Sequence, residues 1–226
     1  MEQRSVALDG PAGAGKSTLA RMAARRFGLI YVDTGALYRC VGLYTQRNNI
    51  DPSDEEAVEK LLPEIEIEMK YDENGVQRMF LRGGDVSDDI RLPEISKYAS
   101  DVSALPPVRE FLLNTQRDMA VRYDVIMDGR DIGTVILPEA GLKVFLTANP
   151  ETRAFRRYLE LREKGIDTSL EEVLEEMISR DKNDSERSAA PLRAADDAFI
   201  LDTTELSLEE SLNSLCSLIT GRLGRV

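Results

Sequence analysis

The stretch GPAGAGKST, Gly10–Thr18, is the most informative part of this sequence. Its glycines, lysine and serine match the pattern GxxxxGK[ST]. The residues before it, Ser5–Asp9, are predicted to form a strand. After it, apolar residues recur at helical spacing from Leu19 to Phe27, and Gly28 ends that pattern. A strand, a glycine loop and a helix in this order predict a phosphate-binding loop.

Each residue type in this loop has a physical role. Glycines let the backbone curl so that successive N–H groups point at phosphate oxygens, and the following helix adds unpaired donors at its N-terminus. Lys16 can reach the outer phosphates of a nucleoside triphosphate, and the Ser17 hydroxyl is placed to bind Mg²⁺. The residues predicted to bind the triphosphate are Gly10, Pro11, Ala12, Gly13, Ala14, Gly15, Lys16, Ser17 and Thr18.

The composition excludes several classes of function. A net charge of -12 argues against nucleic-acid and anionic-membrane partners, because both need a broad cationic surface. The chain has no histidine, so hydrolases with a catalytic histidine and histidine-ligated metal sites are excluded. Cys40 and Cys216 fit no CxxC pattern, and Met1–Arg4 lacks a signal-peptide hydrophobic stretch. We expect a cytoplasmic monomer with no membrane-spanning segment.

Strand-like and helix-like segments alternate along most of the chain, which predicts an α/β fold with a parallel sheet flanked by helices. One segment differs. Residues Ile65–Tyr71 alternate strictly, Asp72–Gly75 carries an Asn-Gly turn signal, and Val76–Leu81 is predicted to return as a partner strand. Residues 63–103 are therefore predicted to be an inserted, β-containing subdomain in a core made of residues 1–62 and 104–226.

The ends of several helices are predicted from capping residues. Ser53 and Glu56 are expected to form a capping box for one short helix, and Thr168 and Glu171 are expected to cap a later helix. Residues 33–35 are predicted to form a polar turn between a strand and a helix.

Three polar stretches contain candidates for binding a phosphoryl acceptor: DTGALYR (residues 33–39), DGRDIGT (128–134) and SRDKNDSERS (179–188). Ligands gather at the carboxyl ends of strands in an open parallel sheet, and the first two stretches follow predicted strands. Arg39 and Arg130 are candidates because a guanidinium bonds two phosphate oxygens at once. The alternatives are a solvated arginine for Arg39 and a structural salt bridge for Arg130.

Asp128 ends an apolar strand, as the Mg²⁺-side acid of a nucleotide kinase often does. A merely turn-forming aspartate fits this position equally well. If the acceptor is itself a phosphate, its second pKa near ~6 means that it is already ionised at neutral pH. No general base is then required, which agrees with the absence of histidine.

Two further groups of charged residues are candidates for contacting phosphate. The arginines of the first group share a helix face and could close over the transferring phosphoryl group. The alternative for this group is that the arginines pair with Glu160 or other carboxylates of the helix. The second falls on one face of a continued helix, for which a solvated charged face is the alternative. The first group is Arg153, Arg156 and Arg157, and the second is Arg180, Asp184 and Arg187.

Together these motifs resemble the bacterial cytidylate kinases, a family of nucleoside monophosphate kinases, over nearly the whole chain. The matching segments are DGPAGAGKST, DTGALYR, the hairpin ending near GGDVSDDIR, ASDVSALPPVRE, DGRDIGTVILPEA and RDKNDSERSAAPL. The resemblance implies an enzyme of pyrimidine metabolism that transfers the γ-phosphoryl group of ATP to CMP or dCMP with Mg²⁺. It also implies that residues 63–103 bind the monophosphate and that residues 153–190 form a mobile lid.

The resemblance assigns roles to particular residues. Those implied for the monophosphate are Thr34, Arg39, Ser100, Arg109, Arg130, Asp131, Arg180, Asp184 and Arg187; the catalytic ones are Lys16, Arg130, Arg153 and Arg157; Ser17 and Asp128 are implied for Mg²⁺. Cytosine offers an amino donor beside ring acceptors. Asp131 is the candidate acceptor for that amino group, with Ser100 and Arg109 as donors to the ring. Surface positions are the alternative for those two donors.

Two other functions remain open. One is a small kinase of the same loop type that acts on UMP, another nucleotide or a small alcohol, and an alcohol acceptor would need a general-base carboxylate. The other is a nucleotide-sensing module that binds ATP without phosphoryl transfer. The complete Lys16–Ser17 pair and the many arginines argue against the sensing module.

Overall fold

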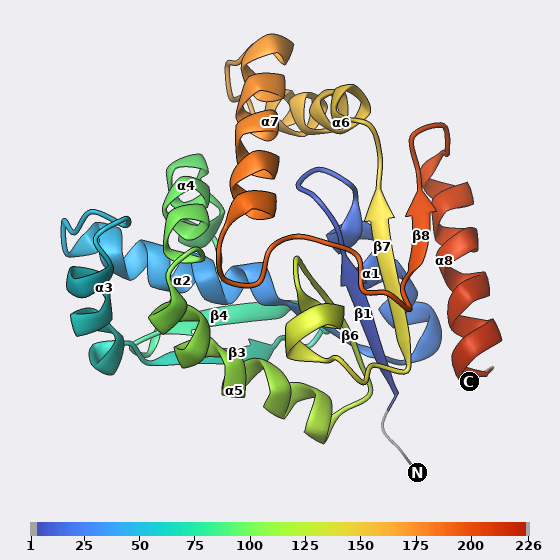
Figure 1. The fold of residues 1–226 in the computed structure, drawn as a ribbon, viewed down its shortest axis with the longest axis horizontal. Coiled ribbons are helices and arrows are strands. Elements are labelled where there is room, and N and C mark those ends of the chain that lie inside the picture. The colour runs from blue at the N-terminus through green and yellow to red at the C-terminus, as the bar shows by residue number, and fades with distance from the viewer. Residues whose placement is uncertain (1–3, 225–226) are drawn as a thin grey trace. The chain divides into compact units, whose positions relative to one another are not determined.

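The computed structural model describes residues 4–224 and divides the chain into two compact units (Figure 1). One unit contains the residues up to Tyr31 and from Ala120 onward, and the other is Val32–Met119. The second unit is wider than the predicted insertion at residues 63–103, because helices on both sides of the hairpin share its core. The roles expected of residues 63–103 and 153–190 stay predictions.

The first unit is built on a parallel sheet with the strand order β2-β6-β1-β7-β8. Strand β1 is flanked by β6 and β7, both parallel to it, and its residues Val6–Leu8 are completely buried. The strands are β1 Ser5–Asp9, β2 Ile30–Asp33, β6 Val125–Gly129, β7 Leu142–Thr147 and β8 Phe199–Asp202. The predicted parallel sheet flanked by helices is confirmed.

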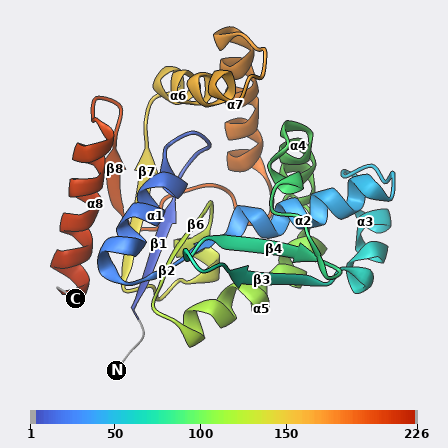
Figure 2. The same ribbon diagram turned by 180° about the vertical axis from the view of Figure 1, so that it is seen from behind.

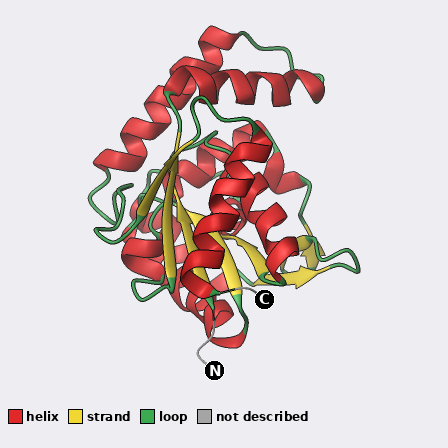
Figure 3. Ribbon diagram, turned by 90° about the vertical axis from the view of Figure 1, so that its right-hand side faces the viewer, coloured by secondary structure: helices red, strands yellow, loops and turns green. Residues whose placement is uncertain are grey.

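Two pairs of helices accompany this sheet. Helices α1, Lys16–Phe27, and α8, Leu208–Leu223, cover one face and pack their apolar residues on β1 and β7 (Figure 2). Helices α6, Pro150–Glu163, and α7, Leu170–Glu186, follow β7 and lie beyond the carboxyl ends of the strands (Figure 1, and from the side in Figure 3). Among the described residues, no helix is both long and apolar enough to cross a membrane.

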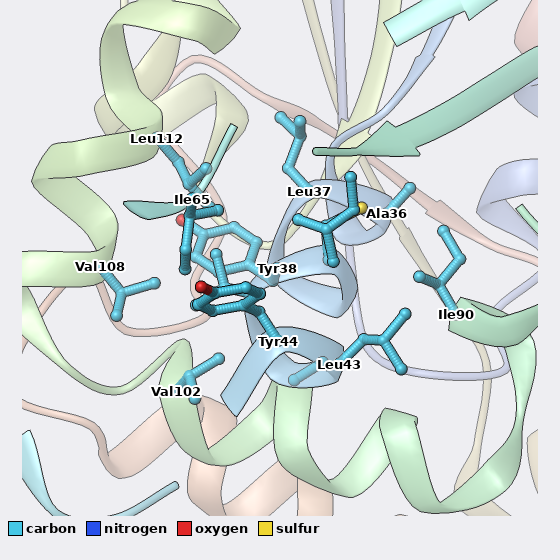
Figure 4. Close-up of a cluster of buried hydrophobic side chains, with 14 of the residues drawn as sticks. Ala36, Leu37, Tyr38, Leu43, Tyr44, Ile65, Ile90, Val102, Val108 and Leu112 are labelled. Atoms are coloured by element: carbon cyan, nitrogen blue, oxygen red, sulfur yellow. The ribbon is translucent and has the colours of Figure 1, made fainter. Parts of the chain in front are cut away.

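The second unit combines helices with a small antiparallel sheet in the order β3-β4-β5. The side chains of α2 lie at the centre of its core and point toward residues from the other helices and from the segment just before β3, such as Val102, Leu112 and Ile65 (Figure 4). Its elements are α2 Thr34–Arg47, α3 Glu55–Leu61, β3 Ile67–Tyr71, β4 Gln77–Leu81, β5 Gly84–Asp85, α4 Pro93–Val102 and α5 Pro106–Arg122, with 3-10 turns at Leu62–Glu64 and Asp89–Arg91.

Three predicted helix starts are wrong. The predicted turn at residues 33–35 is instead the start of α2, because the Asp33 carboxylate accepts the Ala36 N–H and caps that helix. Asp54 caps α3 in place of Ser53, whose N–H and hydroxyl both bond Asp51.

In α7 the capping box is Ser169 with Glu172, one residue later than the predicted pair Thr168 and Glu171. The side chain that can bond two N–H groups at once decides where the helix begins.

Candidate active site

The glycine loop between β1 and α1 requires glycine at its close approaches. Gly10, Gly13 and Gly15 all have positive φ angles, of 147°, 70° and 90°. A Cβ atom on Gly10 would overlap the Leu146 carbonyl group of β7, and one on Gly13 would overlap the Met177 side chain of α7. The loop is therefore held tightly between the sheet and α7, with its curl set by glycine.

Lys16 begins α1 and is buried near two arginines, Arg130 and Arg180, and two aspartates, Asp128 and Asp184. Its Nζ donates a hydrogen bond to the Pro11 carbonyl oxygen at 2.7 Å. Burial, followed by the charge of Arg130, holds the pKa of Lys16 well below its usual range, although Asp128 opposes this. An anionic polyphosphate bound at this point would offset the repulsion between the cations.

Ser17 and Asp128 lie in direct contact beside the loop. The Ser17 hydroxyl donates to Asp128 Oδ2 at 2.7 Å, and the Tyr31 hydroxyl donates to Oδ1 at 3.1 Å. These hard oxygen donors fit Mg²⁺, which keeps several waters and binds through one or two carboxylates and substrate phosphates. Residues 4–224 contain no group of three or more acidic or cysteine side chains that could hold a metal ion.

Arg130 and Asp131 follow β6 and make ion pairs with α7 and the residue that ends it. Arg130 Nε donates to Asp184 Oδ2 at 2.8 Å, and Arg187 lies 3.4 Å from Asp131 Oδ1. Burial lowers the pKa of Arg130, but Asp184, Asp128 and Asp181 together outweigh the effect of burial, and the pKa is raised. Burial opposes ionisation of Asp184, yet Arg130 and Arg180 bring its pKa below the usual value.

The three arginines of α6 have different surroundings. Arg153 is buried; it donates to the carbonyl oxygens of Ala148 and Ala12 and lies 2.6 Å from Asp181. Arg156 bonds Thr203. Arg157 pairs with Glu160 at 3.1 Å in a more exposed setting. Arg153 therefore supports the glycine loop through its hydrogen bond to Ala12. Arg157, by contrast, pairs with Glu160 at the protein surface.

The predicted site residues of the second unit gather around α2. Thr34 is its first residue and is buried, and Arg39 lies 3.5 Å from Asp33. Arg109 lies over the Tyr38 ring at 5.6 Å. Ser100 belongs to α4 and is half-buried.

Gln77 of β4 fixes the start of α2. Its Oε1 accepts the Asp33 N–H at 2.9 Å, and its Nε2 donates to the Asp33 carbonyl oxygen at 3.3 Å. The β3–β4 hairpin is thus hydrogen-bonded to the backbone of Asp33, the residue before Thr34.

Two residues of the first unit were not among the predicted site residues. Tyr31 bonds Asp128, as described above. Asp9 ends β1, and its carboxylate accepts the N–H groups of Ile132 and Gly133, both at 2.7 Å. Burial raises the pKa of Asp9 to about 6. The available signal for Asp9 was an acidic residue at the end of an apolar strand, the same arrangement that singled out Asp128.

The family model and the curated relatives that match this chain name the same family. A family model described as cytidylate kinase matches residues 6–221. The chain is 50% identical over 218 residues to a cytidylate kinase of Caldicellulosiruptor bescii, with 96% of each chain covered. It is 45% identical over 222 residues to a cytidylate kinase of Bacillus cereus, with 98% of each covered.

Among solved structures, the chain resembles a gluconokinase from Sinorhizobium meliloti. The TM-score is 0.50 at 14% identity, and the match covers 99% of this chain and 94% of that one. At this identity the likeness shows the fold alone, which is an α/β fold shared with another kinase.

Proposed function

The chain belongs to the cytidylate kinase family of phosphotransferases, and we propose that it transfers the γ-phosphoryl group of ATP to CMP and dCMP. The products are ADP and CDP or dCDP. One observation carries this proposal: Lys16 is buried beside Arg130, close enough for that charge to lower its pKa, and next to the Ser17–Asp128 pair. Such a site favours two anionic groups brought together.

The donor side of the site is assigned to the glycine loop. Its backbone N–H groups would hold the phosphates of ATP, with Lys16 at the outer ones. Ser17 and Asp128 would hold Mg²⁺, which neutralises charge on the phosphates. The Tyr31 and Ser17 hydroxyls each bond one oxygen of Asp128, so the orientation of this carboxylate is fixed.

The acceptor side is assigned to arginines and their acidic partners. The Arg130 guanidinium is oriented by the Asp184 carboxylate and the Gly129 carbonyl oxygen, and its remaining N–H groups would bind phosphate oxygens. The remaining residues assigned to the monophosphate are Thr34, Arg39, Ser100, Arg109, Asp131, Arg180 and Arg187. An ionised acceptor phosphate needs no general base, so catalysis reduces to alignment and charge neutralisation.

Specificity for cytosine is assigned to Asp131. This carboxylate is buried, and Arg187 lies 3.4 Å from its Oδ1. A buried carboxylate is an acceptor that the cytosine amino group can bind as a donor. Uracil presents an acceptor there, and the unpaired carboxylate would cost about 1–3 kcal/mol. Ser100 and Arg109 are assigned as donors to the ring.

Closure of residues 153–190 over the phosphates is part of the proposal. Arg157 would then leave Glu160 and contact the transferring group, while Arg153 keeps its bonds to the loop. Closure would exclude water and limit wasteful hydrolysis of ATP. We place the enzyme in the cytoplasm as a monomer.

The experiment that tests the proposal is an acceptor panel. Initial rates are measured with ATP, Mg²⁺ and CMP, dCMP, UMP or AMP. We expect kcat/KM for CMP to exceed that for UMP by about tenfold or more. Asp131→Asn should narrow this ratio.

A preference for UMP or AMP, or an unchanged ratio in the variant, would contradict the assignment of specificity. Transfer to none of the four acceptors would favour the nucleotide-sensing module.

A further inference from the structure

Asp9 makes two bonds across the sheet that no other carboxylate of the site duplicates. Its Oδ1 accepts the Ile132 N–H and its Oδ2 accepts the Gly133 N–H, both at 2.7 Å. The side chain is buried, and Asp9 is followed directly by Gly10 of the glycine loop. Asp9 therefore connects the glycine loop to the stretch DGRDIGT, residues 128–134.

The two N–H groups belong to the start of a short π-helix, Ile132–Ile136. The first N–H groups of a helix have no partner within it, so another acceptor must be supplied when they are buried. Asp131 precedes this helix, and its carbonyl oxygen accepts the N–H groups of Val135 and Ile136. Holding the start of the helix consequently fixes the backbone of Asp131 and, through it, that of Arg130.

Gly133 is shaped to this contact. A Cβ atom at this position would stand 3.3 Å from Asp9 Oδ2 and 3.2 Å from Cδ of Lys143. Both distances are tighter than ordinary van der Waals contact, so a larger residue would press on the carboxylate. The approach of the carboxylate to two successive N–H groups depends on a glycine here.

We propose that Asp9 is a positioning residue that fixes Arg130 and Asp131 with respect to the glycine loop and thereby sets the site for the acceptor nucleotide. The inference rests on the proposed assignment of Arg130 and Asp131 to the monophosphate. Asp9 itself touches neither substrate in this account.

The charges around Asp9 support a functional reason for its presence. Burial is the main cause that raises its pKa to about 6, and Asp131 adds to it, while the two N–H groups and Lys16 oppose it. Lys143 contributes only its aliphatic stem near Gly133 and pairs with Asp197. The ionised Asp9 carboxylate is therefore buried here at a cost in stability. What it contributes in return is the pair of hydrogen bonds that hold the start of the π-helix.

The test begins with Asp9→Asn. Asparagine has the same shape, but one oxygen becomes an NH₂ donor that faces an N–H group. We expect KM for CMP to rise about tenfold, while KM for ATP changes by less than about threefold. Asp124→Asn is the matched control, because Asp124 Oδ1 also accepts a backbone N–H at 2.7 Å, from Arg4. Both KM values should be unchanged in that control.

A spectroscopic readout accompanies the kinetics. The amide proton of Gly133 should shift with pH with a midpoint near the Asp9 pKa of about 6 in the parent protein. The same titration should be absent in Asp9→Asn. If that variant does not fold, Gly133→Ala and the titration of the parent decide the question.

The results that overturn the proposal are specific. They are an unchanged KM for CMP in Asp9→Asn, an equal rise in both KM values, or a Gly133 amide that does not titrate in the parent. Arg130→Lys and Asp131→Asn separate this failure from that of the proposed function. If those two variants raise KM for CMP and Asp9→Asn does not, only the role of Asp9 is wrong; if none raises it, the acceptor site is wrongly assigned.

Discussion

Arg153 and Arg157 lie one turn apart on α6 but differ in what removal of each side chain would do. The Arg153 side chain is 4% exposed and pairs with Asp181, whereas Arg157 is 32% exposed and its partner Glu160 is 57% exposed. Removing one member of a buried pair leaves the other charge without compensation, but an exposed pair contributes little.

We therefore expect Arg153→Ala to lower the free energy of unfolding by roughly 3 kcal/mol and Arg157→Ala by less than about 1 kcal/mol. Urea denaturation measures both. Because Arg157 is proposed to contact the transferring phosphoryl group, its alanine variant should lose turnover with little change in KM for ATP. Equal losses of stability, or an Arg157 variant changed only in its affinity for ATP, would contradict these roles.

Asp9 makes stability depend on pH with a definite sign. Its pKa is about 6 in the folded chain against 3.8 as the ordinary value. As the pH rises from about 4 to about 6, the unfolded chain loses this proton first, so the folded chain loses relative stability. Above the folded pKa the penalty is constant, at about 3 kcal/mol.

The measurement compares the parent with Asp9→Asn at about pH 5 and about pH 7.5, where the parent should lose about 1 kcal/mol relative to the variant. Subtracting the variant removes the contribution of the other titrating groups. A parent that gains stability relative to the variant over this range would show that Asp9 is not held at a raised pKa.

Whether the role of a single residue could be predicted depended on how far along the sequence its bonding partners lie. Lys16 and Ser17 belong to one short motif, so their placement in the loop followed from local spacing. Asp9 bonds residues 123 and 124 positions away, and Tyr31 bonds one 97 positions away. No local pattern contains such pairs, because they arise only when β1, β2 and β6 come together in the sheet.

Helix α8 covers the sheet on one face and depends on its cap. The Ser207 hydroxyl accepts the Glu210 N–H, and the Glu210 carboxylate accepts the Ser207 N–H. Ser207→Ala should cost about 1 kcal/mol in the free energy of unfolding. Kinetic constants should be unchanged, since the helix contributes none of the proposed site residues.

Ser217→Ala on the same helix is the control. Its hydroxyl bonds only the Asn213 carbonyl oxygen within the helix, and its removal should change stability by less than about 0.5 kcal/mol. Thermal unfolding distinguishes the two variants. Similar values for both would mean that the cap does not determine the stability of α8.

The elements themselves were predictable where the pattern was long and the signal local. Both ends of β1 and the C-terminal end of α1 agree with the prediction, because β1 is a continuous apolar segment and Gly28 ends α1. The starts of α2, α3 and α7 were missed by one or two residues. In each case several polar residues could cap the helix, and the choice depends on backbone geometry that composition does not specify.

For the molecule as a whole, the alternation of strands and helices predicted the class of fold, whereas the division into units did not follow from it. The hairpin marks only part of Val32–Met119, because α2 and α5 join the same buried core. Sequence periodicity shows which face of a helix is buried but not against which neighbour it packs. The limits of a unit are set by that packing.

The central claim is that this chain joins two phosphates by alignment and positive charge, without a general base. The most direct test is the pH dependence of kcat with saturating CMP and ATP. Between about pH 7 and about pH 8.5 we predict that kcat stays constant within about twofold, since the acceptor phosphate is ionised throughout. A kcat that rises about tenfold per pH unit over this range would reveal a required base and contradict the account.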